Sequence, residues 1–147
     1  MNKIQKSNWP MVANNQISQY LNKSIKSNKV GGAYIFAGPD NLGKTTIAKF
    51  FAQIMLCQNR NESKDEVLPC GACPSCQKFS YDSEGEGGPE QEDLSELHGD
   101  FHIINKEKDK KNVSIKQVRG LISILQLSSF NGGSKVGIIK NAESLCI

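Results

Sequence analysis

The stretch of sequence that decides the fold is AYIFAGPDNLGKT, which runs from Ala33 to Thr45. Its first five residues, 33–37, are continuously apolar and are followed by Gly-Pro, a pattern that predicts a short strand buried on both faces of a parallel sheet. The rest satisfies the pattern G-x-x-x-x-G-K-[ST], in which the backbone N–H groups of a glycine loop surround a phosphate. The stretch therefore predicts an α/β protein with a phosphate-binding loop between a strand and a helix.

The residue types in the loop each have a chemical role in nucleotide binding. Glycines at both ends let the backbone curl so that N–H groups point inward, with the N-terminus of a helix behind them. Lys44 would neutralise the β- and γ-phosphates, and the Thr45 hydroxyl would bind Mg²⁺. The expected ligand is ATP or ADP with Mg²⁺. The predicted binding residues are Gly38, Pro39, Asp40, Asn41, Leu42, Gly43, Lys44, Thr45 and Thr46.

Apolar residues on both sides of the loop continue the α/β pattern. Helical spacing predicts one helix over roughly 14–27 and a second that begins at the loop. Apolar runs predict two further strands, at 101–104 and 135–139. The apolar positions of the helix after the loop are Ile47, Phe50, Phe51, Ile54 and Met55.

The helix between the last two strands has a recognisable beginning. Ser114 is an N-cap candidate with Gln117 three residues later, which is the capping-box pattern. Helical spacing predicts a buried stripe on this helix, formed by Val118, Leu121, Ile122 and Leu125.

Four of the five cysteines form a compact group in the sequence, with the spacing C-x₁₂-C-x₂-C-x₂-C. Four thiolates in this arrangement suit tetrahedral Zn²⁺, and we predict a structural zinc module over residues 57–78. Disulfides, an iron–sulfur cluster and unliganded thiols are the alternatives, although no Cys-Pro follows the group at the ferredoxin spacing. The predicted ligands are Cys57, Cys70, Cys73 and Cys76. Cys146 lies too far along the chain to belong to this group.

Composition and charge narrow the class of protein. The chain has 147 residues, of which 37% are hydrophobic and 22% charged, as expected for one globular domain. It contains no apolar run of about 18 residues and no apolar core near its N-terminus, so we expect neither a membrane span nor a secretory signal. We expect a cytoplasmic protein with reduced thiols.

The net charge of +3 conceals an uneven distribution. Residues 1–78 carry a net charge of +6, residues 79–105 carry −8 and residues 106–147 carry +5. Within the acidic part, residues 80–97 are rich in Gly, Glu and Ser and poor in apolar side chains. We predict a flexible surface insertion there, without a core of its own.

The order of these motifs resembles a known family. Trp9-Pro10 precedes the first helix, the cysteine group follows the helix of the phosphate loop, and His98-Gly99-Asp100-Phe101 resembles an H-P-D-F motif. The segments 114–119 (SIKQVR) and 132–136 (GGSKV) follow in the expected places. This order resembles the delta-prime and gamma/tau subunits of the bacterial DNA polymerase III clamp loader.

The resemblance implies a fold, an activity and partners. Residues 1–147 would be the N-terminal part of an AAA+ nucleotide-binding domain, a P-loop NTPase fold. The lid and collar domains would lie beyond residue 147. The protein would be an accessory subunit of the polymerase holoenzyme in the bacterial cytoplasm. It would assemble with gamma/tau and delta subunits into a hetero-oligomer that loads the sliding clamp on primed DNA.

The residues after the last predicted strand bear on hydrolysis. Family members that hydrolyse ATP have Asp-Glu there, whereas this chain has Lys140-Asn141. An ammonium group cannot bind Mg²⁺, and an amide cannot act as a general base near neutral pH. We therefore predict a delta-prime-type subunit that binds nucleotide without hydrolysing it and has no catalytic residues of its own.

Two other hypotheses remain open at this stage. One is a working ATPase of the gamma/tau type or another AAA+ motor, which an ATPase assay would reveal. The other is a zinc-containing DNA-binding module. Against the latter, residues 69–78 contain only Lys78 as a cation, which is too little positive charge to bind a phosphate backbone.

Overall fold

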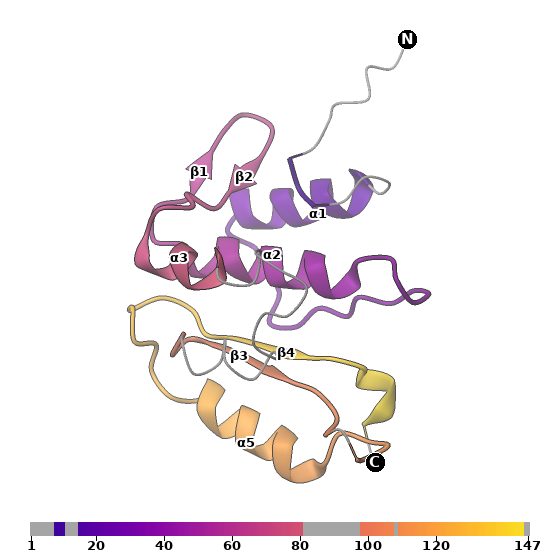
Figure 1. Cartoon of the computed structure of the whole chain (residues 1–147). Coiled ribbons are helices and arrows are strands. Elements are labelled where there is room, and N and C mark those ends of the chain that lie inside the picture. The colour runs from indigo at the N-terminus through magenta and orange to yellow at the C-terminus, as the bar shows by residue number, and fades with distance from the viewer. Residues whose placement is uncertain (1–7, 11–14, 81–97, 108, 146–147) are drawn as a thin grey trace. The chain divides into compact units, whose positions relative to one another are not determined.

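The computed structural model describes residues 8–10, 15–80, 98–107 and 109–145. The chain divides into an N-terminal unit, Met1–Cys70, and a C-terminal unit, Gly71–Ile147 (Figure 1). The structure is of the α/β class, with helices and a parallel sheet, as the sequence predicted. No helix in the described ranges is long and apolar enough to cross a membrane.

The described residues of the N-terminal unit form two helices and a small hairpin. Helix α1 (Asn15–Lys26) and helix α2 (Lys44–Leu56) lie where helical spacing predicted them. Strands β1 (Asn61–Glu62) and β2 (Val67–Leu68) form an antiparallel hairpin that the sequence pattern did not reveal. One apolar core joins these elements, and its buried members are Trp9, Leu21, Ile25, Ile47, Phe51, Ile54 and Val67.

The hairpin is held to helix α1 by a buried amide. Asn22 is 5% exposed, and its side-chain oxygen accepts a hydrogen bond of 2.8 Å from the backbone N–H of Val67. This bond satisfies a buried backbone donor that would otherwise cost free energy. A second link lies at the surface, where Glu66 accepts hydrogen bonds from the backbone and the side chain of Asn8.

The prediction of a strand at residues 33–37 is wrong for the described structure. The segment pairs with no strand in the described part of the chain. Tyr34 and Phe36 pack against the core of the N-terminal unit, whereas Ile35 is 91% exposed. The segment thus partly buries two alternate side chains against the core and leaves the one between them exposed. A central strand needs hydrogen-bonded neighbours as well as apolar side chains, and a run of apolar residues reports only the latter.

The C-terminal unit contains the parallel sheet. Strand β3 (Phe101–Ile104) pairs in parallel with strand β4 (Val136–Ile139), with Phe101 opposite Val136 and Ile104 opposite Ile139. Both strands lie where the sequence predicted them. The unit also contains helix α3 (Pro74–Ser80), helix α5 (Ile115–Leu125) and the short 3₁₀ helix η1 (Ala142–Ser144).

Helix α5 lies along the sheet formed by β3 and β4 (Figure 1). A glycine permits the close approach: a Cβ atom at Gly137 would lie 3.0 Å from side-chain carbons of both Leu121 and Leu125. Such distances are shorter than ordinary van der Waals contact, so a side chain at position 137 would require Leu121 and Leu125 to move by a few tenths of an ångström.

The N-terminus of α5 confirms the predicted capping box. Ser114 accepts a hydrogen bond from the backbone of Gln117, and the Gln117 side chain accepts one from the backbone of Ser114. The predicted buried stripe is only partly right, because Leu121 is 5% exposed but Ile122 is 49% exposed. Ile122 lies about 100° around the helix from Leu121. A sheet of two strands is too narrow to cover both positions.

Two sequence predictions lie outside the described residues. All of the predicted acidic insertion at 80–97 except Ser80 lies outside the described residues. Cys146 also lies outside them.

Candidate phosphate loop and cysteine cluster

The predicted phosphate loop joins the segment 33–37 to helix α2. Its backbone takes left-handed conformations at Asn41, with φ 61°, and at Gly43, with φ 75°, while Gly38 has φ 151°. These φ values favour glycine and asparagine and explain their presence in the loop. Helix α2 then begins at Lys44 with no side-chain cap and no acidic residue in its first turn. Its first N–H groups can therefore serve an anion.

Lys44 is folded over the loop that it follows. Its ammonium group donates hydrogen bonds to the backbone oxygens of Gly38 and of Pro39, the latter at 3.0 Å. The Asp40 carboxylate lies 3.9 Å away and is fully exposed. The two backbone oxygens and the carboxylate hold the Lys44 ammonium group over the loop. A bound phosphate would take their place as its partner. The structure thus brings the predicted loop residues together at the start of α2.

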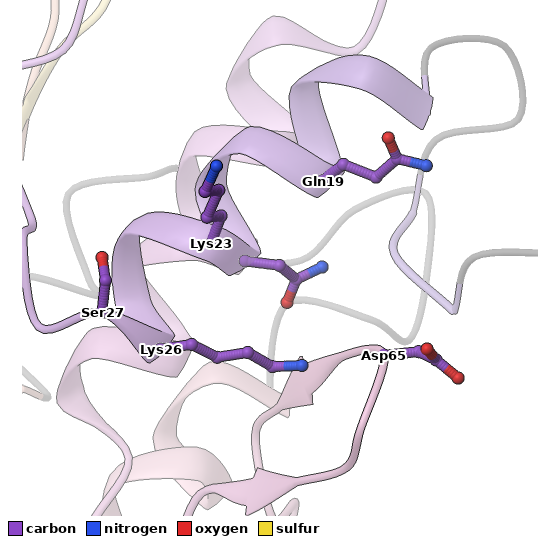
Figure 2. A pocket seen from close by; sticks show the side chains of 6 residues that line it. Gln19, Lys23, Lys26, Ser27 and Asp65 are labelled. Carbon is purple, nitrogen blue, oxygen red and sulfur yellow. The ribbon is translucent and has the colours of Figure 1, made fainter.

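A hollow elsewhere on the N-terminal unit does not involve these residues. Its volume is about 420 Å³, and it lies between helix α1 and the turn of the hairpin (Figure 2). The Lys26 ammonium group spans part of it, donating a hydrogen bond of 2.7 Å to the backbone oxygen of Lys64. The hollow is lined by Gln19, Asn22, Lys23, Lys26, Ser27 and Asp65.

The four predicted metal ligands are brought together. Their four Sγ atoms all lie within 4.8 Å of one another. Zn–S bonds of about 2.3 Å in a tetrahedron would place the sulfurs about 3.8 Å apart, so little adjustment is needed to hold the ion. No disulfide joins any two of these cysteines. The donor set and its spacing therefore fit a closed tetrahedral metal site.

Local backbone geometry forms this cluster. Cys57 is the C-cap of helix α2, Cys70 follows strand β2, and Cys76 lies in helix α3. The backbone N–H of Cys70 donates to the Cys57 sulfur at 3.3 Å, and that of Cys76 donates to the Cys73 sulfur at 3.4 Å. Hydrogen bonds of this kind favour the thiolate form that binds a metal. Three of the four ligands are buried, and Cys70 is intermediate.

The residues after β4 carry no acidic pair. The backbone N–H of Lys140 donates to the Ile104 oxygen at 2.9 Å, continuing the register of the sheet. Asn141 has φ 52°, and its side chain donates to the Asn105 side chain at 3.1 Å. The next acidic residue is Glu143, in helix η1. The polar groups at the end of β4 are therefore an ammonium and an amide.

Sequence reasoning missed a buried carboxylate next to β3. Asp100 is 1% exposed and accepts hydrogen bonds from the Ser129 hydroxyl and from the backbone N–H groups of Phe130 and Asn131, at 2.9, 2.9 and 3.1 Å. The ammonium group of Lys135 lies 3.6 Å away. Asp100 thereby fixes the loop between α5 and β4. The H-G-D-F motif marked the residue, but nothing in the sequence indicated its partners.

The loop that Asp100 fixes carries an exposed aromatic ring. Phe130 is 80% exposed, and the Lys135 ammonium lies 5.0 Å from the centre of its ring. The ring also lies against Gly99, where a Cβ atom would lie 2.6 Å from a ring carbon. Glycine is therefore required at position 99 for this placement of the ring.

Acid is expected to destabilise the C-terminal unit in two steps. Burial lowers the pKa of His98 below 6.5, and the charge of Lys78 acts in the same direction. Burial alone would raise the pKa of Asp100, but the hydrogen bonds from Phe130, Ser129 and Asn131 and the charge of Lys135 bring it below 3.8. In both cases the unfolded chain binds the proton at higher pH than the folded chain does. Each group therefore contributes fully to the free energy of unfolding at a pH above its pKa in the unfolded chain. This contribution is lost as the pH falls through the lower pKa that the group has in the folded chain.

Urea midpoints measured between pH 8 and pH 3 would check this expectation. The first decrease should begin below about pH 6.5 and the second below about pH 4. The variant His98→Gln should lack the first decrease and keep the second. A wild-type midpoint that rises between pH 7 and pH 5 would contradict the assignment for His98.

Comparison with known proteins identifies the family. The family described as DNA polymerase III, delta subunit, matches residues 13–146. Subunit delta' of DNA polymerase III from Pseudomonas aeruginosa is 26% identical over 113 residues, which cover 77% of this chain and 29% of that protein. Subunit tau/gamma from Haemophilus influenzae is 33% identical over 135 residues, or 92% of this chain and 17% of that protein.

A plant protein shares part of the chain. Protein STICHEL-like 4 of Arabidopsis thaliana is 39% identical over 72 residues, which cover 49% of this chain and 7% of that protein. The chain thus spans less than a third of the length of each of these relatives. It belongs to the DNA polymerase III delta-subunit family, and the predicted resemblance to delta-prime-type clamp-loader subunits is confirmed.

Proposed function

We propose that this protein is a delta-prime-type subunit of the DNA polymerase III clamp loader that binds a nucleotide through residues 38–46 and does not hydrolyse it. The proposal that the nucleotide is not hydrolysed rests on the pair Lys140-Asn141, directly after strand β4. Family membership supports the assignment to the clamp loader. Residues 1–147 would then act as an AAA+ nucleotide-binding domain.

Nucleotide binding is supported by the geometry of the loop. Left-handed residues curl the backbone, and the uncapped N-terminus of α2 lies directly behind it. Lys44 is about one-third exposed and is held by loop carbonyls, so it can exchange these for phosphate oxygens. The Thr45 hydroxyl would help to hold Mg²⁺, whose charge would offset that of the phosphates.

The absence of hydrolysis follows from the chemistry of the groups after β4. In the members of the resembled family that hydrolyse ATP, the Asp would hold Mg²⁺ and the Glu would orient and polarise the attacking water. Lys140 would repel Mg²⁺, and the Asn141 amide has no basic lone pair near neutral pH. Losing the general base alone should reduce the rate by about 10²–10⁴.

The cysteine cluster would hold one structural zinc ion. All four positions of the tetrahedron would be filled by thiolates, which leaves no position for substrate and favours a stabilising role. The module would span residues 57–78, with residues 80–97 as an acidic insertion beyond it. The partners would be the gamma/tau and delta subunits in the cytoplasm, and through them the sliding clamp and primed DNA.

The first test measures nucleotide affinity and turnover on the full chain. Wild-type protein is expected to bind ADP or ATP with Mg²⁺, measured by calorimetry. Lys44→Ala should weaken binding by roughly 10–100-fold, the effect of one charge-assisted hydrogen bond to phosphate. Neither protein should release phosphate from ATP above background.

A lysine away from the loop provides the matched control. Lys23 is exposed on α1, and Lys23→Ala should bind nucleotide as the wild type does. Phosphate release by the wild type that Lys44→Ala abolishes would show a working ATPase of the gamma/tau type instead. Failure of the wild type to bind either nucleotide would refute the binding proposal, and co-purification with gamma/tau and delta subunits would still test the assembly.

A further inference from the structure

The turn between two of the predicted metal ligands is tied to a histidine far along the chain. Ser75 lies between Cys73 and Cys76 and is 2% exposed. Its hydroxyl oxygen lies 2.7 Å from Nε2 of His98, which is 1% exposed. A fully buried hydrogen bond of this length is strong because water does not compete with it.

The tautomer of the histidine follows from its other nitrogen. The backbone N–H of Asp100 donates to Nδ1 of His98 at 3.2 Å. Because a backbone N–H can only donate, Nδ1 accepts, and the neutral imidazole carries its proton on Nε2. His98 therefore donates to the hydroxyl oxygen of Ser75, and the orientation of the bond is set by the backbone that leads into β3.

Aromatic packing reinforces this link. The ring of Phe79, on helix α3, lies edge-on to the rings of His98 and Phe101. Its centre is 5.6 Å from the centre of the His98 ring and 5.0 Å from that of the Phe101 ring. Phe79 is 8% exposed and Phe101 is 0% exposed. Helix α3, which contains Cys76, is thus attached to the start of β3 by one hydrogen bond and two ring contacts.

From this geometry we propose that His98 is a positioning residue for the metal centre, which it serves by holding the Cys73–Cys76 turn in its metal-binding arrangement through Ser75. The inference rests on the proposed metal site and adds a residue outside the cysteine motif to it. His98 does not bind the ion itself, since its two ring nitrogens are used by Ser75 and Asp100.

The physical consequence is a coupling between metal affinity and the packing of α3 on β3. A site that adopts its binding arrangement for only a fraction of the time loses apparent affinity by that fraction. Partners that orient metal ligands typically change affinity by about 10–100-fold. By thermodynamic linkage, the metal in turn stabilises the packing of α3 on β3.

The experiment measures the zinc affinity of the full chain by competition with a chromophoric chelator at pH 7.5. His98→Ala is expected to weaken zinc binding by about tenfold. His98→Gln can still donate from its side-chain amide to Ser75 and should recover most of the affinity. Ser75→Ala should match His98→Ala, and the double variant should bind zinc no more weakly than either single variant.

Two controls separate positioning from a general loss of stability. Leu121→Ala removes buried packing between α5 and the sheet, so it should lower the melting temperature and leave zinc affinity at 25 °C unchanged. His102→Gln changes the other histidine of the unit, whose ring contacts the Gly99 oxygen, and should bind zinc normally.

Each outcome bears on a different statement. If the wild type binds no zinc, the proposed metal site fails, and this inference with it. If the wild type binds zinc and both His98→Ala and Ser75→Ala bind it equally well, the site stands and the positioning role of His98 is refuted. If His98→Ala does not fold, Ser75→Ala decides between these results.

Discussion

Replacement of Asp100 by alanine is expected to lower the free energy of unfolding by about 3–5 kcal/mol, the cost of removing one partner from a buried ion pair. The Lys135 side chain is 5% exposed, so its ammonium group would be left in a buried site without its carboxylate. The backbone N–H groups of Phe130 and Asn131 would lose their acceptor at the same time. Urea unfolding followed by far-ultraviolet circular dichroism would measure the loss.

An exposed aspartate in the same unit provides the comparison. Asp109→Ala should change the free energy of unfolding by less than about 0.5 kcal/mol. Adding Lys135→Met to Asp100→Ala should recover part of the loss, because the second change removes the uncompensated charge. If Asp100→Ala proves as harmless as Asp109→Ala, the hydrogen-bond network around this carboxylate does not stabilise the fold.

Loss of one cysteine ligand is expected to have the second large effect. Wild-type protein should contain one zinc ion per chain, measured by elemental mass spectrometry. Cys76→Ser should reduce zinc affinity by more than the roughly 10–100-fold that follows loss of a group that only orients a ligand. The folding free energy that the ion supplies would be lost with it, so the variant should melt at a lower temperature.

The fifth cysteine is the matched control for this experiment. Cys146→Ser should retain zinc and the wild-type melting temperature, since sequence spacing excludes Cys146 from the cluster. A chelator should lower the melting temperature of the wild type toward that of Cys76→Ser and leave Cys76→Ser unchanged. Iron and a visible absorbance in place of zinc would establish a cluster of another kind, and four titratable thiols without metal would refute the metal site.

Local patterns predicted the local structure well. The capping box at Ser114 and the parallel strands β3 and β4 are confirmed because they depend on residues adjacent in the sequence or on short apolar runs. The closeness of the four cysteines is likewise confirmed, and three of them are separated by only two residues from the next in the sequence. Zinc itself and the nucleotide remain predictions.

Hydrogen bonds between residues far apart in the sequence could not be predicted from the sequence pattern. Asp100 bonds to residues 29–31 positions further along the chain, and neither periodicity nor composition records a contact of that kind. The same reason explains why the Ser75–His98 bond was not foreseen. The sequence pattern also predicted too much burial at Ile122, because hydrophobicity does not show which side chains the sheet will cover. It predicted a strand at 33–37 because hydrophobicity does not show whether a segment has a neighbouring strand to pair with.

The contact between Phe79 and His98 has a practical consequence for protein engineering. The centres of these two rings lie 5.6 Å apart, so Phe79 and His98, which are 19 positions apart in the sequence, are held together. When the ends of a connection are fixed together, doubling its length costs only about 0.6 kcal/mol of closure entropy. The sequence between Phe79 and His98 is therefore a natural place to insert an affinity tag or a fluorescent reporter, because both ends of the insertion point are already fixed by this contact.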